Sequence, residues 1–163
     1  METLNNKKPR PALLTVIGIL SFVGLGYRIL TGVINAALGT VTSTLAPFIS
    51  DILENEADLS DVPEPVQKIV VGIFEAITKL MANITGIYIT IVLLSVVALL
   101  GVIMMWQLKK AGFYLYAAAR VLLILVPFVF IGYNLISILI FSSGLIFAVL
   151  FIVLYSLNLK EMS

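Results

Sequence analysis

The chain contains no cysteine and no histidine. Without cysteine it has no disulfide, no thiolate metal site and no thiol redox pair. Without histidine it lacks the commonest general base and the favoured metal ligand. Only 12% of its 163 residues are charged, whereas 61% are hydrophobic. A soluble domain has typically about 25% charged residues, so this composition indicates an integral membrane protein.

Acidic residues are missing where catalysis or coupled transport needs them, because the long apolar segments of the chain contain none. Nucleophilic catalysis requires a base beside the nucleophile, and proton- or sodium-coupled transporters usually carry a carboxylate within the membrane. We therefore expect no enzymatic activity, no catalytic residue, no cofactor and no metal site. The net charge of +1 gives no basic field for nucleic acid, so we expect no nucleic-acid partner.

Four segments have the roughly 20 predominantly apolar residues that a transmembrane helix requires. They lie at residues 11–34, 85–106, 112–132 and 134–157. The first follows a basic stretch, as the core of a signal peptide does, but the cleavage signal after it is poor, with no clean small-x-small site in "VINAALG", so we expect it to stay as a span. The sequence thus predicts an all-α membrane protein, a single membrane domain of four transmembrane helices over residues 1–163.

Lysine and arginine in the short loops predict the orientation, because they are retained on the cytoplasmic side. With four spans, all three basic loop segments fall on one side. They are the N-terminal segment with Lys7, Lys8 and Arg10, the loop with Lys109 and Lys110, and the C-terminal segment with Lys160. We therefore expect both termini in the cytoplasm and residues 38–83 on the opposite side of the membrane.

Residues 38–83 are predicted to form an extracytoplasmic helical hairpin between the first two spans. Two apolar stripes alternate in steps of three and four, as in a coiled-coil seam. They are Leu38, Val41, Leu45, Phe48 and Ile52, and then Val66, Val70, Ile73, Ile77, Leu80 and Ile84. The stripes either pack on each other or lie on a neighbouring subunit. Pro47 predicts a kink or an early end of the first arm, and Pro63 with Pro65 predicts a second helix that begins near Glu64.

The tip of this predicted hairpin, residues 50–64, collects six of the nine acidic residues of the chain. They are Asp51, Glu54, Glu56, Asp58, Asp61 and Glu64. Three interpretations stay open: a solvated cap, a docking surface for a basic partner, and a cation site. The last is the weakest, because the tip lacks the glycine and the terminal bidentate glutamate of a calcium loop.

Two arginines lie inside predicted spans, Arg28 in the first and Arg120 in the third. A charge within the membrane is costly and marks a functional site by default. The side chain of Arg120 leans toward the cytoplasmic surface and is expected to reach the headgroups. Arg28 lies in the outer half of its span and leans toward the bilayer centre, so we expect a buried partner. The candidates are Tyr133, Asn134, a backbone carbonyl, a lipid phosphate or another subunit.

Small residues follow Arg28 at intervals of four along the same helix. The column is Arg28, Gly32, Ala36, Thr40 and Thr44. Small residues at this spacing let two helices approach closely. The column is therefore interpreted either as a tight contact within the chain or as a face for another protein.

The segment "WQLKKAGFYLYAAARVLLILVP", residues 106–127, resembles the corresponding segment of small, uncharacterised four-span membrane proteins from bacteria of the Bacteroidota type. In both, a basic turn with interfacial aromatic residues joins two spans. The resemblance implies a bacterial inner membrane and no particular activity.

The absence of catalytic groups favours a non-catalytic role, that of an accessory or scaffold subunit in a larger membrane assembly. Its partners are then the lipid bilayer and other membrane protein subunits. The alternative is a homo-oligomeric pore or carrier for a small solute or ion, in which this chain is its own partner. The second alternative is a lipid-binding protein that holds a headgroup on Arg28.

Overall fold

The computed structural model describes residues 12–56 and 62–162, and these ranges are almost entirely helical. The helices are α1 (Ala12–Glu56), α2 (Glu64–Trp106), α3 (Lys110–Phe130), α4 (Leu135–Ser156) and the short 3₁₀ helix η1 (Leu159–Glu161). Helices α1 to α4 are each long and apolar enough to cross a membrane. The predicted all-α fold with four candidate membrane spans is therefore confirmed.

The four long helices fall into two length classes. Helices α3 and α4 have 21 and 22 residues, which is about 32 Å at 1.5 Å per residue and matches a hydrocarbon core about 30 Å thick. Helices α1 and α2 have 45 and 43 residues, or about 65 Å each. Each of these two is therefore long enough to cross a bilayer and to continue well beyond α3 and α4.

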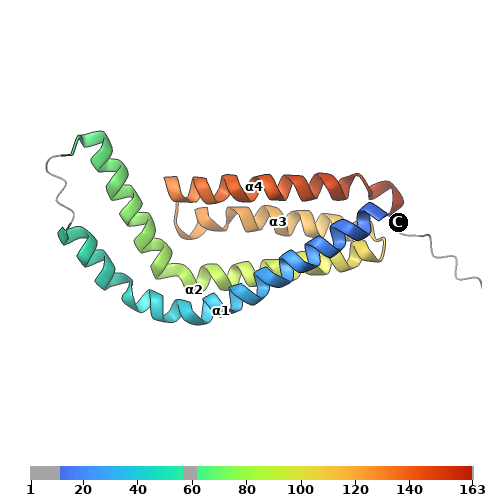
Figure 1. The fold of residues 1–163 in the computed structure, drawn as a ribbon, viewed down its shortest axis with the longest axis horizontal. Helices are drawn as coiled ribbons and strands as arrows, with labels where there is room; N and C mark the ends of the chain where they lie inside the picture. The colour runs from blue at the N-terminus through green and yellow to red at the C-terminus, as the bar shows by residue number, and fades with distance from the viewer. Residues whose placement is uncertain (1–11, 57–61, 163) are drawn as a thin grey trace, which may run out of the picture.

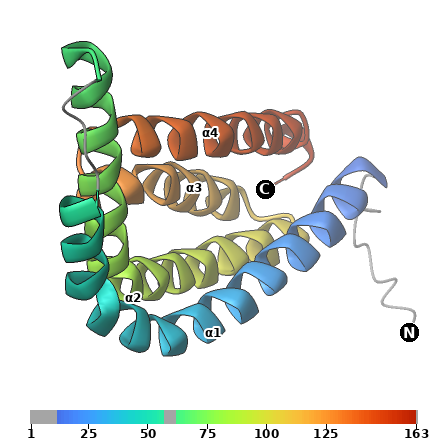
Figure 2. The same cartoon turned by 60° about the vertical axis from the view of Figure 1, so that its left-hand side comes forward.

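Figures 1 and 2 show how this excess length is used. Helices α3 and α4 lie side by side, and the second half of α2 runs along α3. The first half of α2 and the last part of α1 turn away from this direction and run across the end of the bundle where α3 connects to α4.

The proline predictions have different outcomes in the two long helices. Helix α1 continues through Pro47, so the predicted early end is wrong, although the helix curves in this half (Figure 1). Helix α2 begins at Glu64, directly after Pro63, as the two prolines predict.

Two glycines allow a backbone-to-backbone contact between α2 and α3. A Cβ atom on Gly101 would lie 2.8 Å from the carbonyl oxygen of Gly112, and one on Gly112 would lie 2.6 Å from the carbonyl oxygen of Gly101. The two backbones therefore touch, with no room for a side chain between them. Around this contact lies the main core, which includes Ala98, Met105 and Tyr116.

A second, smaller core lies where α2 crosses the end of the α3–α4 pair. Ala76 and Ile87 of α2 are buried with Val126 of α3 and with Ile131, which follows α3. Ala76 belongs to the first half of α2, so this half is packed against the bundle.

The two predicted apolar stripes do not pack on each other. The five α1 stripe residues, Leu38, Val41, Leu45, Phe48 and Ile52, are all exposed, and Phe48 keeps 63% of its surface accessible. Small residues of α1 face inward instead: Ala46 is buried, and a Cβ on Gly39 would lie 2.7 Å from Oγ1 of Thr85 in α2. In the second stripe Val66 is exposed, whereas the other five residues are half-buried.

The contact between α2 and α3 predicts a strong effect of one methyl group. Gly101→Ala is expected to lower the free energy of unfolding by about 1–3 kcal/mol, because overpacking forces two backbones apart. Gly26→Ala in α1 is the matched control, since no described atom from a neighbouring helix lies within 4 Å of the position that its Cβ would take. Thermal unfolding in mild detergent measures both. Equal midpoints for the two variants would show that α2 and α3 do not meet at Gly101.

Candidate functional site

A cavity of about 260 Å³ lies between α1, α3 and α4. Both arginines of the predicted spans line it, Arg28 from α1 and Arg120 from α3, and Gly144 is part of the wall that α4 forms. The rest of the wall is mainly leucine, isoleucine and phenylalanine. The structure thus brings the two intramembrane charges to one apolar cavity.

Aromatic rings hold Arg120 in this cavity. Its guanidinium carbon lies 5.6 Å from the centre of the Tyr116 ring and 5.7 Å from the centre of the Phe151 ring. Tyr116 precedes Arg120 by one helical turn, so the side chain leans toward the beginning of α3. Ring faces attract a cation, but Nε of Arg120 is buried and has no hydrogen-bond partner among the residues that the structure describes. Arg120 is therefore positioned by the rings and keeps unused hydrogen-bonding capacity.

A polar contact between α1 and α4 forms one end of the cavity. The hydroxyl group of Tyr155 in α4 donates a hydrogen bond of 2.9 Å to Oγ of Ser21 in α1. The Tyr155 ring meets the Tyr116 ring edge to face, with the centroids 5.1 Å apart, and both tyrosines are buried. Since Ser21 and Tyr116 line the cavity, this end offers hydroxyl groups beside Arg120.

Arg28 stands between the first cavity and a second one of about 220 Å³. Four residues line both cavities: Arg28, Leu123, Pro127 and Ile140. The side chain of Arg28 is exposed, so a ligand in either space can reach it. We call the two adjoining cavities together the arginine groove.

The arginine groove contains positive charge without a counter-charge. Among the residues that the structure describes, none that lines the groove is acidic. In the part of the chain that the structure describes, the ion pairs join Glu64 to Lys68 at 2.8 Å and Glu75 to Lys79 at 3.5 Å, all within α2. Two guanidinium groups in a low-dielectric cavity repel each other. An anion between them is the simplest group that removes this repulsion.

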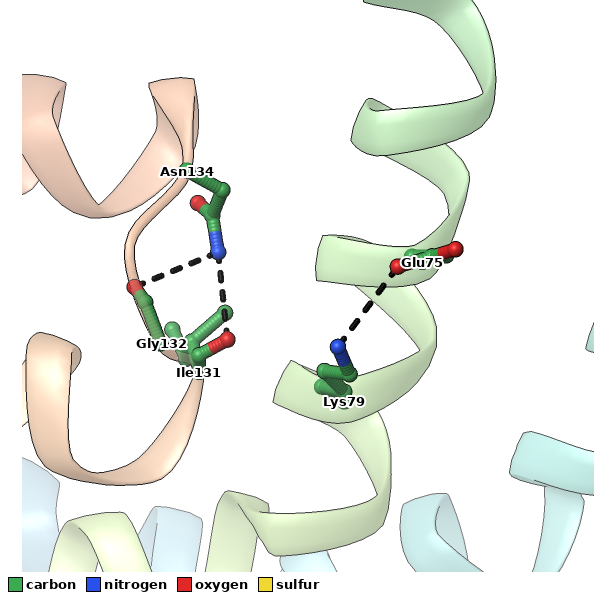
Figure 3. A network of polar contacts seen from close by, with 5 residues as sticks. All are labelled: Glu75, Lys79, Ile131, Gly132 and Asn134. Atoms are coloured by element: carbon green, nitrogen blue, oxygen red, sulfur yellow. Dashed lines mark hydrogen bonds and ion pairs between the residues drawn. The ribbon is translucent and has the colours of Figure 1, made fainter. Parts of the chain in front are cut away.

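The residues that the sequence proposed as partners of Arg28 lie elsewhere. Figure 3 shows Asn134 in the α3–α4 connection, where its Nδ2 donates hydrogen bonds to the carbonyl oxygens of Ile131 (3.1 Å) and Gly132 (3.4 Å). Its Oδ1 accepts from the backbone N–H group of Ser137 at 2.8 Å. Asn134 therefore caps α4, and the neighbouring Tyr133 is 90% exposed. Neither residue lines the arginine groove.

The column of small residues that follows Arg28 divides between two environments. Gly32 is buried, and a Cβ there would lie 2.6 Å from Cγ2 of Val92 in α2, so this end makes a close contact within the chain. Ala36 is half-buried, whereas Thr40 and Thr44 are exposed. The two threonine hydroxyl groups donate to carbonyl oxygens of their own helix.

The acidic tip is only partly described. Asp51 is exposed in α1, and Glu64 begins α2, where it pairs with Lys68. The side chains of Glu54 and Glu56, and the whole of Asp58 and Asp61, lie outside the described residues. Glu75 and Lys79, the second ion pair, lie further along α2 (Figure 3).

Sequence reasoning missed Ser21, Tyr116, Phe151 and Tyr155 as parts of the site. One signal was present: Tyr116 precedes Arg120 by four residues, a spacing that puts both side chains on one helix face. Ser21 and Tyr155 belong to spans at opposite ends of the chain, and no pattern within either span connects them.

Comparison with known proteins found no relative of this chain. No protein family, no curated protein and no solved structure matches this chain. The resemblance of residues 106–127 to four-span bacterial proteins therefore stays an expectation, and any proposed function has to be argued from the structure itself.

Proposed function

We propose that this protein binds an anionic lipid, with Arg28 and Arg120 holding the acidic group in the arginine groove. The observation that carries the proposal is the convergence of these two arginines on one apolar-walled cavity that no acidic residue lines. Lipid binding on Arg28 is one of the functions that the sequence left open, and Arg120 joins it here.

The chemistry of guanidinium favours this ligand. Arginine forms bidentate, charge-assisted hydrogen bonds with phosphate and carboxylate oxygens. In a low-dielectric cavity such bonds are strong, and an unpaired cation within the apolar part of a membrane is costly. Arg120 lines the first cavity, and among the described residues its buried Nε has no hydrogen-bond acceptor that would hold the guanidinium group away from a ligand.

The position of the groove favours a lipid over a water-soluble anion. Arg120 stands at the middle of α3, and the helices around it are the candidate membrane spans. The surrounding wall is hydrocarbon apart from Ser21, Tyr116 and the two arginines. A ligand that enters from the bilayer brings its own apolar part and does not need an aqueous path.

Replacing the two arginines tests the proposal. Arg28→Gln and Arg120→Gln are each expected to reduce the anionic lipid that copurifies with the protein by about tenfold or more, because a charge-assisted hydrogen bond contributes about 1.5–3 kcal/mol. Native mass spectrometry of protein extracted in mild detergent measures bound lipid and identifies its headgroup. Lys110→Gln removes the same charge from the exposed start of α3 and is expected to change lipid binding less than twofold. Equal amounts of bound lipid in wild type and in the double arginine variant would overturn the proposal.

We further propose the orientation that the basic residues predict, with both termini in the cytoplasm and the connection between α1 and α2 on the other side. Four candidate spans return the chain to its starting side, which supports this arrangement. In it the extensions of α1 and α2 form the extracytoplasmic hairpin expected for residues 38–83.

Cysteine labelling tests the orientation on a clean background, because the natural chain has no cysteine. In intact bacterial spheroplasts, Asp51→Cys is expected to react with a membrane-impermeant maleimide. Lys160→Cys is expected to react only after permeabilisation. The reverse pattern would place the α1–α2 connection in the cytoplasm and refute the orientation.

The accessory or scaffold role is a second candidate, and the exposed α1 stripe favours it. Large apolar residues face outward there while small ones face α2, which is the arrangement of a contact surface. The pore or carrier alternative shares the prediction that the chain has protein neighbours, and stoichiometry separates the two: unrelated chains indicate a scaffold, and a closed ring of copies indicates a pore.

The stripe therefore predicts an assembly that polar substitutions weaken. Native mass spectrometry is expected to detect this chain in a complex, and Val41→Ser combined with Phe48→Ser is expected to shift most of it to the single chain. Val129→Ser, at a site on α3 that is 77% exposed, is the control and should leave the complex intact. A wild-type protein that is already a single chain in every mild detergent would contradict both assembly functions.

A further inference from the structure

We infer that the ligand of the arginine groove is an acidic amphiphile with a single hydrocarbon chain, whose acid lies at Arg28 and Arg120 and whose chain extends into the second cavity. This inference rests on the proposed function and adds the chemical class and the direction of the ligand.

The polarity of the groove changes along its length. At one end the first cavity presents the side chains of Ser21, Tyr116 and Arg120. Beyond Arg28, the second cavity is lined by aliphatic side chains such as Leu80, Ile84 and Ile87, together with Tyr88 and Pro127. A polar head followed by an apolar chain matches this sequence of environments.

The direction of the ligand follows from the helices that line each cavity. The guanidinium group of Arg120 lies beside Tyr116, toward the end of the bundle where α3 begins. The second cavity reaches Ile131, just past the other end of α3. Along α3, Arg120 and Ile131 are separated by about 16 Å at 1.5 Å per residue. The chain of the ligand therefore runs from the middle of the bundle toward the α3–α4 connection.

Packed side chains line the far end of the second cavity. Ile87, Val126 and Ile131 line the cavity and belong to the buried cluster that includes Ala76, and Leu80 packs against the same cluster. Ala76 and Leu80 belong to the first half of α2, and this half crosses the end of the bundle (Figure 2). The finite length of the cavity sets a limit on the number of methylene groups that its walls can contact.

The size of the second cavity favours one chain over two. Its volume is about 220 Å³, which suits a single alkyl chain better than a pair. Leu123 and Pro127 are two of the four residues that line both cavities, so the chain would pass along α3 at these positions.

Chain-length selectivity tests the inference. The probes are alkyl phosphates from octyl to octadecyl, the fatty acids of the same lengths, a diacyl phosphatidic acid and inorganic phosphate. Calorimetric titration of the full-length protein in mild detergent gives the affinities. Affinity is expected to rise about three- to fourfold per added methylene, as a buried methylene group predicts, and to stop rising at one length. Binding of either single-chain series supports the inference, and the better series identifies phosphate or carboxylate as the acid.

Two variants of opposite effect make the test independent of misfolding. Ile84→Trp shortens the second cavity and is expected to move the optimum to shorter chains, whereas Ile84→Ala lengthens it and is expected to move the optimum to longer chains. Ile89→Trp, at an exposed site of α2 outside the groove, should leave the optimum unchanged. A misfolded protein loses affinity for every chain and does not shift the optimum.

The outcomes separate this inference from the proposed function. If inorganic phosphate and all chain lengths bind equally and depend on Arg28 and Arg120, the anion site stands and the single-chain inference is overturned. Tighter binding of the diacyl lipid than of every single-chain probe also overturns it. If no probe binds in a way that Arg28→Gln or Arg120→Gln weakens, the proposed function fails and the inference fails with it.

Discussion

The close packing of α2 against its neighbours through glycine is the constraint on which the rest of the structure depends. Lipid tails are as apolar as leucine, so burial of apolar surface does not drive spans together, and helices associate where their backbones approach closely. Gly101 and Gly112 bring α2 against α3, and Gly32 and Gly39 bring α1 against α2. Helix α2 thereby holds α1 and α3 on separate faces, and the distance between those two helices leaves room for the arginine groove.

Helix α4 completes the site from the other side. It packs on α3 at Gly144 and meets α1 through the hydrogen bond from Tyr155 to Ser21. A hydroxyl–hydroxyl bond between buried groups joins these two helices at one point and leaves space beside it. The cavity is therefore a consequence of how the four helices are held, and the arginines occupy it because each lies on the helix face that turns toward this space.

The arginine groove gives a role to two features of the sequence: the charges within the apolar segments and the length of α2. Two cations lie within the apolar segments 11–34 and 112–132, which contain no carboxylate to pair with them, and the structure places both at one cavity, where the proposed anionic ligand would pair with them. The long first half of α2 is the other feature. It crosses the end of the α3–α4 pair (Figure 2) and supplies Leu80 to the wall of the second cavity and Ala76 to the buried cluster beside it, so the extension beyond the bilayer-length part of α2 contributes to the shape of the site.

Elements that depend on local composition could be predicted from the amino-acid sequence. Runs of apolar residues predicted the four candidate spans, and Pro63 with Pro65 predicted the start of α2 at Glu64, because span length and proline stereochemistry act within a few turns of chain. It also identified Arg28 and Arg120 as unusual charges. It did not predict their common cavity, nor that Asn134 caps α4 instead of approaching Arg28. Only the tertiary structure decided these points, because the face that each helix presents is set by backbone contacts between residues far apart in the chain, such as Gly101 with Gly112, and no periodicity within one span records them.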